Sequence, residues 1–159
     1  MITLATAADL PQILAIYAHA RAFMAQHGNP NQWGASRPTE ADITAHIAAC
    51  ELYVLREADA IHGVFAFILG EDPTYRVIEQ GTWLSDAPYG TIHAVASDGQ
   101  IHGLLSQIVA YCEQTTKHLR IDTHHDNAIM QHVILKNGFT RCGIIHIASG
   151  AERIAFEKV

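Results

Sequence analysis

VASDGQIHGLL, from Val95 to Leu105, is the stretch of sequence that decides the fold. Its pattern predicts the end of a strand, a short loop containing Gly99 and Gly103, and the start of a helix. Such a junction points free backbone N–H groups outward at the positive end of the helix dipole, which suits an anion such as a pyrophosphate. Glycine also lets a phosphate approach without a Cβ in the way. Taken alone, the segment also fits an ordinary strand–loop–helix connection, most of which bind nothing.

A second segment of the same kind follows at 119–139, LRIDTHHDNAIMQHVILKNGF. It predicts a strand at 119–123 and a helix that is capped by Asp126 or Asn127 and ends at Asn137-Gly138. A helix over 103–117 joins the two segments. The two junctions in this order are far more specific than either one alone.

The rest of the chain completes an alternation of strands and helices. Capping boxes at Thr6–Asp9 and Thr39–Asp42 predict helices that run to about Gln26 and Ala49. Further strands are expected at 2–5, 52–56, 61–69, 91–97, 139–147 and 153–158, with a short additional strand at 75–78. The order predicts an α/β (α+β) fold in which a mixed sheet carries helices on both faces.

Composition indicates one ordinary globular domain over residues 1–159, with 49% hydrophobic and 16% charged residues. A formal net charge of −6 argues against a nucleic-acid partner. We expect Cys50, Cys112 and Cys142 to be reduced core thiols of a cytoplasmic protein. The first residues do not resemble a signal peptide, and no stretch is long and apolar enough for a bilayer span.

The sequence resembles the GNAT superfamily of N-acetyltransferases over nearly its whole length. The matching segments are Thr6-x-x-Asp9, Ile92–Ser97 with Gln100-x-x-Gly103, Asn127 with Lys136–Phe139, and the closing strands at Cys142–Ile144 and Arg153–Phe156. THHDN at 123–127 and NPNQW at 29–33 suggest a bacterial small-molecule branch. The resemblance implies the GNAT acyl-CoA N-acyltransferase fold, a mostly antiparallel seven-stranded sheet with about four helices. It also implies acetyl-CoA as co-substrate, a small-molecule amine acceptor, a possible homodimer, and no metal, nucleic acid or membrane.

In that family two neighbouring strands splay apart and the pantetheine arm lies between them; here these are 91–97 and 119–123. The backbone of Val95 and Ser97 would then pair with pantetheine amides, and the Val95 N–H would donate to the thioester carbonyl. Asn127 would hold the arm. The expected pyrophosphate ligands are backbone amides of the loop: Gln100, Ile101, His102, Gly103, Leu104 and Leu105.

Three features depart from the family pattern. Leu105 stands where a small residue is usual, and Ile134 stands where a tyrosine commonly protonates the departing thiolate. No Lys or Arg lies between Arg76 and Lys117. The first two departures favour an alternative, a non-catalytic acyl-CoA-binding or sensor domain. The third favours a protein of this fold that has lost CoA and serves as an interaction module.

Direct attack by an amine on the thioester needs a neutral amine, and a positioned histidine or carboxylate usually provides one. His93 is the first candidate, since strand alternation would place it on the same face as Val95 and histidine titrates near neutral pH. Glu79 and His124 are further candidates, His124 also as a substitute acid. A surface or hydrogen-bonded histidine is the alternative for His93. Transfer in this fold is direct, so Cys142 is not expected to act as a nucleophile.

The expected acceptor pocket involves aromatic residues in polar loops. Trp33, Trp83 and Tyr89 would line it, and Arg21 would meet an acceptor carboxylate. The tryptophans equally fit a role in covering the edge of the core, and Arg21 fits a solvated helix position. His124, His125 and His132 have poor spacing for zinc, so no metal is expected.

Overall fold

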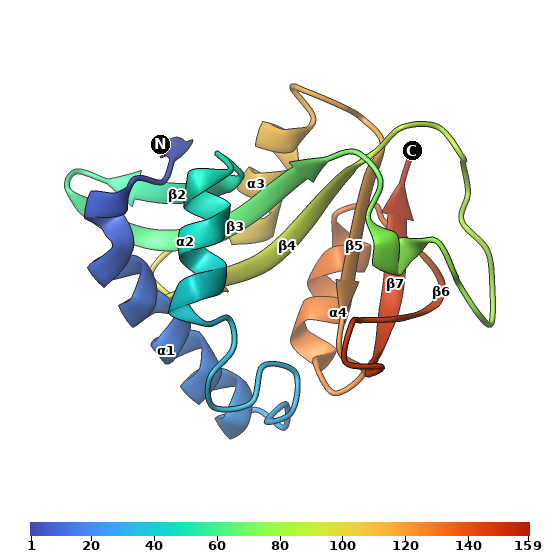
Figure 1. The fold of residues 1–159 in the computed structure, drawn as a ribbon, viewed down its shortest axis with the longest axis horizontal. Helices are drawn as coiled ribbons and strands as arrows, with labels where there is room; N and C mark the ends of the chain where they lie inside the picture. Colours follow the sequence, from blue (N-terminus) through green and yellow to red (C-terminus); the bar gives the residue numbers. More distant parts are fainter. The chain divides into compact units, whose positions relative to one another are not determined.

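The computed structural model describes residues 1–159 as seven strands and four α-helices (Figure 1). The strands are β1 Ile2–Leu4, β2 Leu52–Glu57, β3 Ala60–Leu69, β4 Gly90–Ser97, β5 Leu119–Thr123, β6 Thr140–His146 and β7 Glu152–Lys158. The helices are α1 Leu10–Gln26, α2 Glu40–Ala48, α3 Leu104–Cys112 and α4 Ala128–Lys136.

The chain forms two compact units. The first contains Met1–Phe67 and His93–Leu104, and the second contains Ile68–Ile92 and Leu105–Val159. Strand β4 contributes to both, since its first three residues belong to the second unit. That the whole chain works as a single domain stays a prediction.

The seven strands have the order β1-β2-β3-β4-β5-β7-β6. Strand β4 runs parallel to β5, with Gly90–Ile92 paired to Leu119–Ile121. The pairs β1–β2, β2–β3, β5–β7 and β6–β7 are antiparallel. The predicted mixed sheet of seven strands with four helices is therefore confirmed.

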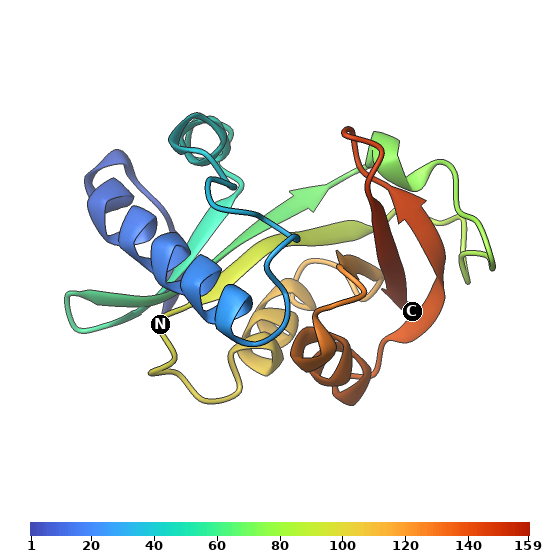
Figure 2. The same cartoon turned by 90° about the horizontal axis from the view of Figure 1, so that it is seen from below.

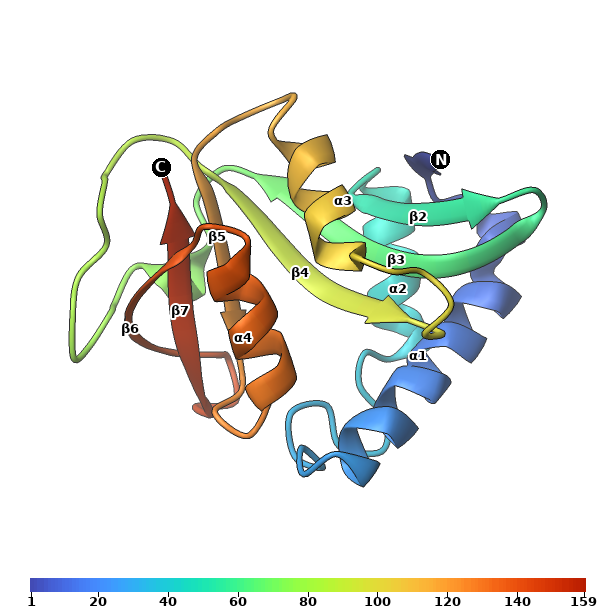
Figure 3. The same ribbon diagram turned by 180° about the vertical axis from the view of Figure 1, so that it is seen from behind.

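In the first unit, α1 and α2 lie on the same face of β2 and β3 (Figures 2 and 3). Helix α2 begins at the predicted capping box of Thr39 and Asp42, and the box of Thr6 and Asp9 caps a 3-10 turn, Ala7–Asp9, that leads directly into α1. The buried side chains between these layers include Ile13, Tyr17, Ile43, Val54 and Val64. Full burial of such a side chain stabilises the fold by about 1.5–3 kcal/mol, so this core fixes α1 against the sheet.

In the second unit, α4 lies along β5 and β7 (Figure 3). The side-chain oxygen of Asn127 accepts a hydrogen bond from the Met130 N–H at 3.0 Å and caps this helix, as one of the two predicted caps. Ile134 of α4 is fully buried, as are Ile121 and Phe156 of the strands. Burial of these apolar side chains stabilises the second unit.

Three details differ from the sequence-based expectations. No strand forms at 75–78: Pro73–Tyr75 is a 3-10 turn that the Asp72 side chain caps by accepting from the Thr74 N–H, and only an isolated bridge joins Glu79 to Ile144. Helix α3 ends at Cys112 rather than near Lys117, since the β-branched pair at 115–116 is a poor continuation of a helix. Cys50 is exposed just after the end of α2, so only the other two cysteines are core thiols.

None of the helices has the length and apolar character needed to cross a bilayer.

Candidate active site

The second half of β4 contains a backbone irregularity at Ala94. This residue has a left-handed φ of 52° in the middle of a strand, which costs a non-glycine residue about 1–2 kcal/mol. The three successive residues His93, Ala94 and Val95 are all half-buried, so the usual alternation of buried and exposed positions is interrupted. The prediction that His93 and Val95 share one face assumed a regular strand, and this irregularity removes that support. A role for His93 as the base stays a prediction.

The Ala94 carbonyl is held by a buried tyrosine. The Tyr17 hydroxyl on α1 donates a hydrogen bond of 2.8 Å to this carbonyl oxygen. Burial raises the pKa of Tyr17 far above its ordinary value, so the hydroxyl keeps its proton and stays a donor. Trp33 lies edge-on to the Tyr17 ring, with 5.6 Å between ring centroids. The loop tryptophan, the helix tyrosine and the irregular strand residue are therefore in consecutive contact.

Two predicted acceptor-pocket residues lie in this first unit. Trp33 is half-buried and packs against the core beside Tyr17. Arg21 lies one turn after Tyr17 on α1, and its guanidinium donates to the Arg37 carbonyl at 3.3 Å. Their part in binding an acceptor stays a prediction.

In the loop after β4, some backbone N–H groups donate to protein acceptors and others do not. The Gly99 N–H donates to Ser97 Oγ at 2.8 Å, and the Gln100 N–H donates to Asp98 Oδ1 at 3.0 Å. No protein group accepts a hydrogen bond from the N–H of Ile101 or Gly103. The amides of the predicted anion cradle that have no protein acceptor are therefore those of Ile101 and Gly103, and the Gln100 amide would have to exchange Asp98 for a phosphate.

The glycines of this loop leave space for a ligand. Gly99 and Gly103 adopt left-handed φ values of 83° and 66°, and a Cβ at either would meet no atom within 4 Å. Leu105 is only 2% exposed. Its bulky side chain is part of the core, so it does not stand in solvent over the loop.

Asp98 brings a negative charge to the same loop, a feature that the sequence analysis missed. Its carboxylate lies 2.7 Å from Nδ1 of His62 on β3. Burial alone would raise the pKa of Asp98, but hydrogen bonds from His62 and the Gln100 amide hold it below its ordinary value. The acidic residue before Gly99 is visible in the sequence, whereas its histidine partner becomes apparent only from strand pairing.

His124 lies directly after β5 in the second unit and is buried. Its Nδ1 accepts a hydrogen bond from the Asp126 N–H at 3.0 Å, so a neutral ring carries its proton on Nε2. Burial, with the nearby His125 and Arg153, lowers the pKa of His124 and favours this neutral form. His124 is therefore arranged as a hydrogen-bond donor through Nε2. Its predicted role as base or acid stays open.

The group His124, His125 and Asp126 places one possible metal-ligand atom of each residue within 4.8 Å of the others. The Nδ1 of His124 is already an acceptor within the group, and the two histidine rings are stacked at 4.3 Å. Stacked rings direct their in-plane lone pairs side by side rather than toward one point. The arrangement is a weak one for a metal ion.

Two other predicted residues of the second unit are engaged by their own segments. The side-chain oxygen of Asn127 caps α4, as described above. Glu79 has an exposed side chain, and its backbone forms two hydrogen bonds with Ile144, at 2.9 and 2.8 Å. Their predicted contacts with the pantetheine arm and the acceptor stay predictions.

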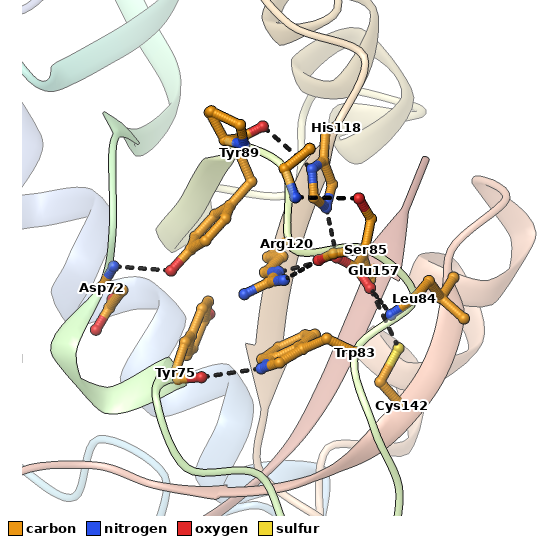
Figure 4. A network of polar contacts seen from close by, with 12 residues as sticks. Asp72, Tyr75, Trp83, Leu84, Ser85, Tyr89, His118, Arg120, Cys142 and Glu157 are labelled. Atoms are coloured by element: carbon orange, nitrogen blue, oxygen red, sulfur yellow. Dashed lines mark hydrogen bonds and ion pairs between the residues drawn. The ribbon is translucent and has the colours of Figure 1, made fainter.

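Trp83 and Tyr89 enclose a buried cation (Figure 4). The Arg120 guanidinium carbon lies 3.9 Å from the ring centroid of each. The Trp83 Nε1–H donates to the Tyr75 carbonyl at 2.9 Å, and the Tyr89 hydroxyl accepts from the Asp72 N–H at 2.8 Å. In these contacts both aromatic residues cover the charged interior of the second unit. For Trp83 this is close to the alternative role of covering the edge of the core, and a part for either residue in the acceptor pocket stays a prediction.

Arg120 belongs to a buried ionic cluster that the sequence analysis also missed. Its Nε donates to Glu157 Oε1 at 3.0 Å, and the same carboxylate accepts from His118 Nε2 and the Leu84 N–H (Figure 4). Arg120 also donates to the Ser85 carbonyl at 2.7 Å. Glu157 is fully buried, so the cluster ties the segment 83–85 to β5 and β7.

The predicted site residues thus fall into two groups. The first unit holds Arg21, Trp33, His93, Val95, Ser97 and the loop amides of 100–104; the second holds Glu79, Trp83, Tyr89, Leu105, His124 and Asn127. The splaying of β4 from β5 beyond Ile92 and Ile121 stays a prediction, because those later residues belong to different units.

Comparison with solved structures finds acetyltransferases of the same fold, one of which is also similar in sequence. An acetyltransferase of the GNAT family from Streptococcus agalactiae is 30% identical, with a TM-score of 0.89 over 100% of this chain and 94% of that chain. A GNAT-family acetyltransferase from Listeria monocytogenes is 16% identical, with a TM-score of 0.71 over 99% and 93% of the two chains. A phosphinothricin acetyltransferase from Sinorhizobium meliloti in complex with acetyl-CoA is 16% identical, with a TM-score of 0.64 over 99% and 86%. No family model and no curated protein matches the sequence.

Proposed function

Because the chain belongs to the GNAT family of acetyltransferases, we propose that it transfers an acetyl group from acetyl-CoA to the amine of a small molecule by direct attack. The observation that carries this proposal is the open loop after β4. Two amides without protein acceptors, at Ile101 and Gly103, lie just before the first turn of α3. Backbone amides at the start of a helix are suited to a diphosphate.

The residues of the loop fit the proposed ligand. The space beside Gly99 and Gly103 is empty, and the Leu105 side chain is in the core. The absence of Lys and Arg between 77 and 116 leaves the cradle to backbone dipoles alone. The carboxylate of Asp98 opposes an anion there. These features together predict that the loop binds the diphosphate of acetyl-CoA, but more weakly than a loop with a Lys or Arg side chain would.

Acetyl-CoA supplies an activated acetyl group when it is bound. The Val95 N–H would donate to the thioester carbonyl oxygen, where negative charge develops during attack, and one such donor is worth about 3 kcal/mol. His93 would accept the proton of the amine, directly or through a water. Ile134 is buried and has no proton to give, so the departing thiolate would take its proton from another donor. His124 could act as that acid only in its doubly protonated form, because the Nε2–H of a neutral imidazole is a far weaker acid than a thiol.

The remaining proposals follow from the same function. We take the acceptor to be a small amine held near Trp33 and Arg21 of the first unit. The acceptor contacts expected of Trp83 and Tyr89 in the second unit stay predictions. We also propose one cytoplasmic domain over residues 1–159 that can pair as a homodimer. A non-catalytic acyl-CoA-binding or sensor domain is the second candidate, favoured by the buried Ile134.

Two measurements test the proposal. Acetyl-CoA at a hundredfold its Kd should stabilise the protein by about 2.7 kcal/mol in a thermal shift assay. Thiol release across a panel of small amines should then show turnover, measured in a Cys50→Ser background because Cys50 is an exposed thiol. Stabilisation without thiol release favours the sensor, and no stabilisation by acetyl-CoA or CoA refutes both.

The matched control uses a second left-handed glycine. Gly103 and Gly150 have φ values of 66° and 86°, and neither has an atom within 4 Å of an added Cβ. Gly103→Ala and Gly150→Ala therefore introduce the same backbone strain, of about 1–2 kcal/mol. Only the first should lose the stabilisation by acetyl-CoA, since Gly150 lies in the turn between β6 and β7.

A further inference from the structure

The left-handed conformation of Ala94 requires something to hold it. Unlike Gly99 and Gly103, this residue carries a Cβ that disfavours a positive φ. Such a conformation persists only when its surroundings determine it, and it is typical of functional sites. A neighbouring group must therefore stabilise the backbone of Ala94 in this conformation.

Tyr17 supplies a fixed donor at this point. Its side chain is 1% exposed and is packed within the core of the first unit. Trp33 packs against this ring in a T-shaped arrangement. The hydroxyl reaches the Ala94 carbonyl oxygen at 2.8 Å, so that oxygen is directed toward α1.

The planar peptide transmits this restraint to the next residue. In a trans peptide the C=O of one residue and the N–H of the next point in opposite directions. Because Tyr17 holds the Ala94 oxygen on the α1 side, the Val95 N–H must point away from α1. We propose that Tyr17 is a positioning residue that sets the direction of the Val95 N–H, the donor assigned above to the thioester carbonyl; this rests on the proposed function.

Tyr17 acts through the peptide and does not contact the reacting atoms. Its removal should therefore affect the chemical step more than binding of the CoA portion. Tyr17→Phe keeps the ring and its packing and deletes only the hydroxyl. Since a misplacement of about 1 Å can cost a hundredfold in rate, we expect kcat to fall about tenfold to a hundredfold. The Kd for CoA, which has no thioester carbonyl, should be unchanged.

The control variant is Ile16→Val, on the same helix and in the same core. It removes one buried methylene group and no hydrogen bond to β4. A purely structural role for Tyr17 predicts that both variants lose stability and that kcat follows stability in both. The positioning role predicts a fall in kcat for Tyr17→Phe alone, and that result would support it.

A second readout does not depend on turnover. In a sample labelled with 15N and 13C, Tyr17→Phe should shift the Val95 amide signal and the Ala94 carbonyl signal, whereas Ile16→Val should leave both close to their wild-type positions. If the wild-type protein shows no acetyl-CoA-dependent thiol release, the proposed function fails, and a shift of these signals still establishes the restraint. If Tyr17→Phe leaves the Val95 and Ala94 signals in place, or leaves kcat unchanged in an active enzyme, the positioning role is refuted.

Discussion

Replacing Glu157 by glutamine should destabilise the protein more than any change at a surface ion pair. The Glu157 carboxylate is fully buried and accepts from Arg120 and His118 through Oε1 and from the Leu84 N–H through Oε2. Glutamine has only one acceptor oxygen, so one side would lose its acceptor and present an NH2 group to donors. Arg120 would also keep its charge in the interior without a counterion.

Breaking a buried ion pair on one side costs about 3–5 kcal/mol. For a chain of this size each kcal/mol lowers Tm by about 2–4 °C, so Glu157→Gln should lower Tm by about 6–20 °C. Differential scanning calorimetry and urea unfolding would measure the change. The control is Glu113→Gln, which loses only the partly exposed contacts with Lys158 at 2.7 Å and Lys117 at 3.9 Å. Exposed pairs of this kind contribute about 0–1 kcal/mol.

The effect should also depend on pH in a defined direction. Burial alone would raise the pKa of Glu157, but hydrogen bonds from His118, Leu84 and Arg120 hold it below its ordinary value. A lowered carboxyl pKa gives stability that is complete above the unfolded value of about 4.3 and is lost as the pH falls through the folded value. The difference between wild type and Glu157→Gln should thus be largest near neutrality and shrink below about pH 4. A loss no larger than that of Glu113→Gln at pH 7 would refute this reasoning.

Three further predictions concern the loop, the base and a backbone contact. Asp98→Asn keeps an acceptor for the Gln100 amide but removes the negative charge, so calorimetric titration should show CoA binding up to about tenfold tighter; unchanged or weaker binding would contradict a phosphate in that loop. His93→Ala should lower kcat by about a hundredfold or more and remove the limb of the pH–rate profile that reports the base; thiol release at the wild-type rate would exclude His93. Gly81→Ala would place a Cβ 1.8 Å from the Cys142 carbonyl oxygen, and overpacking against backbone should cost about 3 kcal/mol in urea unfolding; a neutral result would mean that this contact yields.

The elements and their order were predictable because capping boxes and apolar periodicity are local signals. Thr6–Asp9 and Thr39–Asp42 mark helix starts in the sequence as clearly as in the structure. The loop at Gly99 and Gly103 was predictable for the same reason, since left-handed turns favour glycine.

The features that were missed depend on contacts between distant parts of the chain. Arg120 and Glu157 look like exposed positions in alternating strands, and only the pairing of β5 with β7 and the covering segment at 83–89 bury them together. The irregularity at Ala94 has no sequence signal, because alanine does not favour a positive φ and the restraint comes from Tyr17, far earlier in the chain. Fold was thus predictable from local chemistry, whereas the details of the site were set by tertiary contacts.

An NMR titration of the 15N-labelled protein with CoA tests the central claim most directly, because it reports on individual backbone amides. We predict that the Ile101 and Gly103 signals shift first and most strongly, while the signal of Gly150 stays in place. Saturation with CoA that leaves the two loop amides unmoved would contradict a diphosphate site after β4, and with it the proposed transfer of an acetyl group from acetyl-CoA.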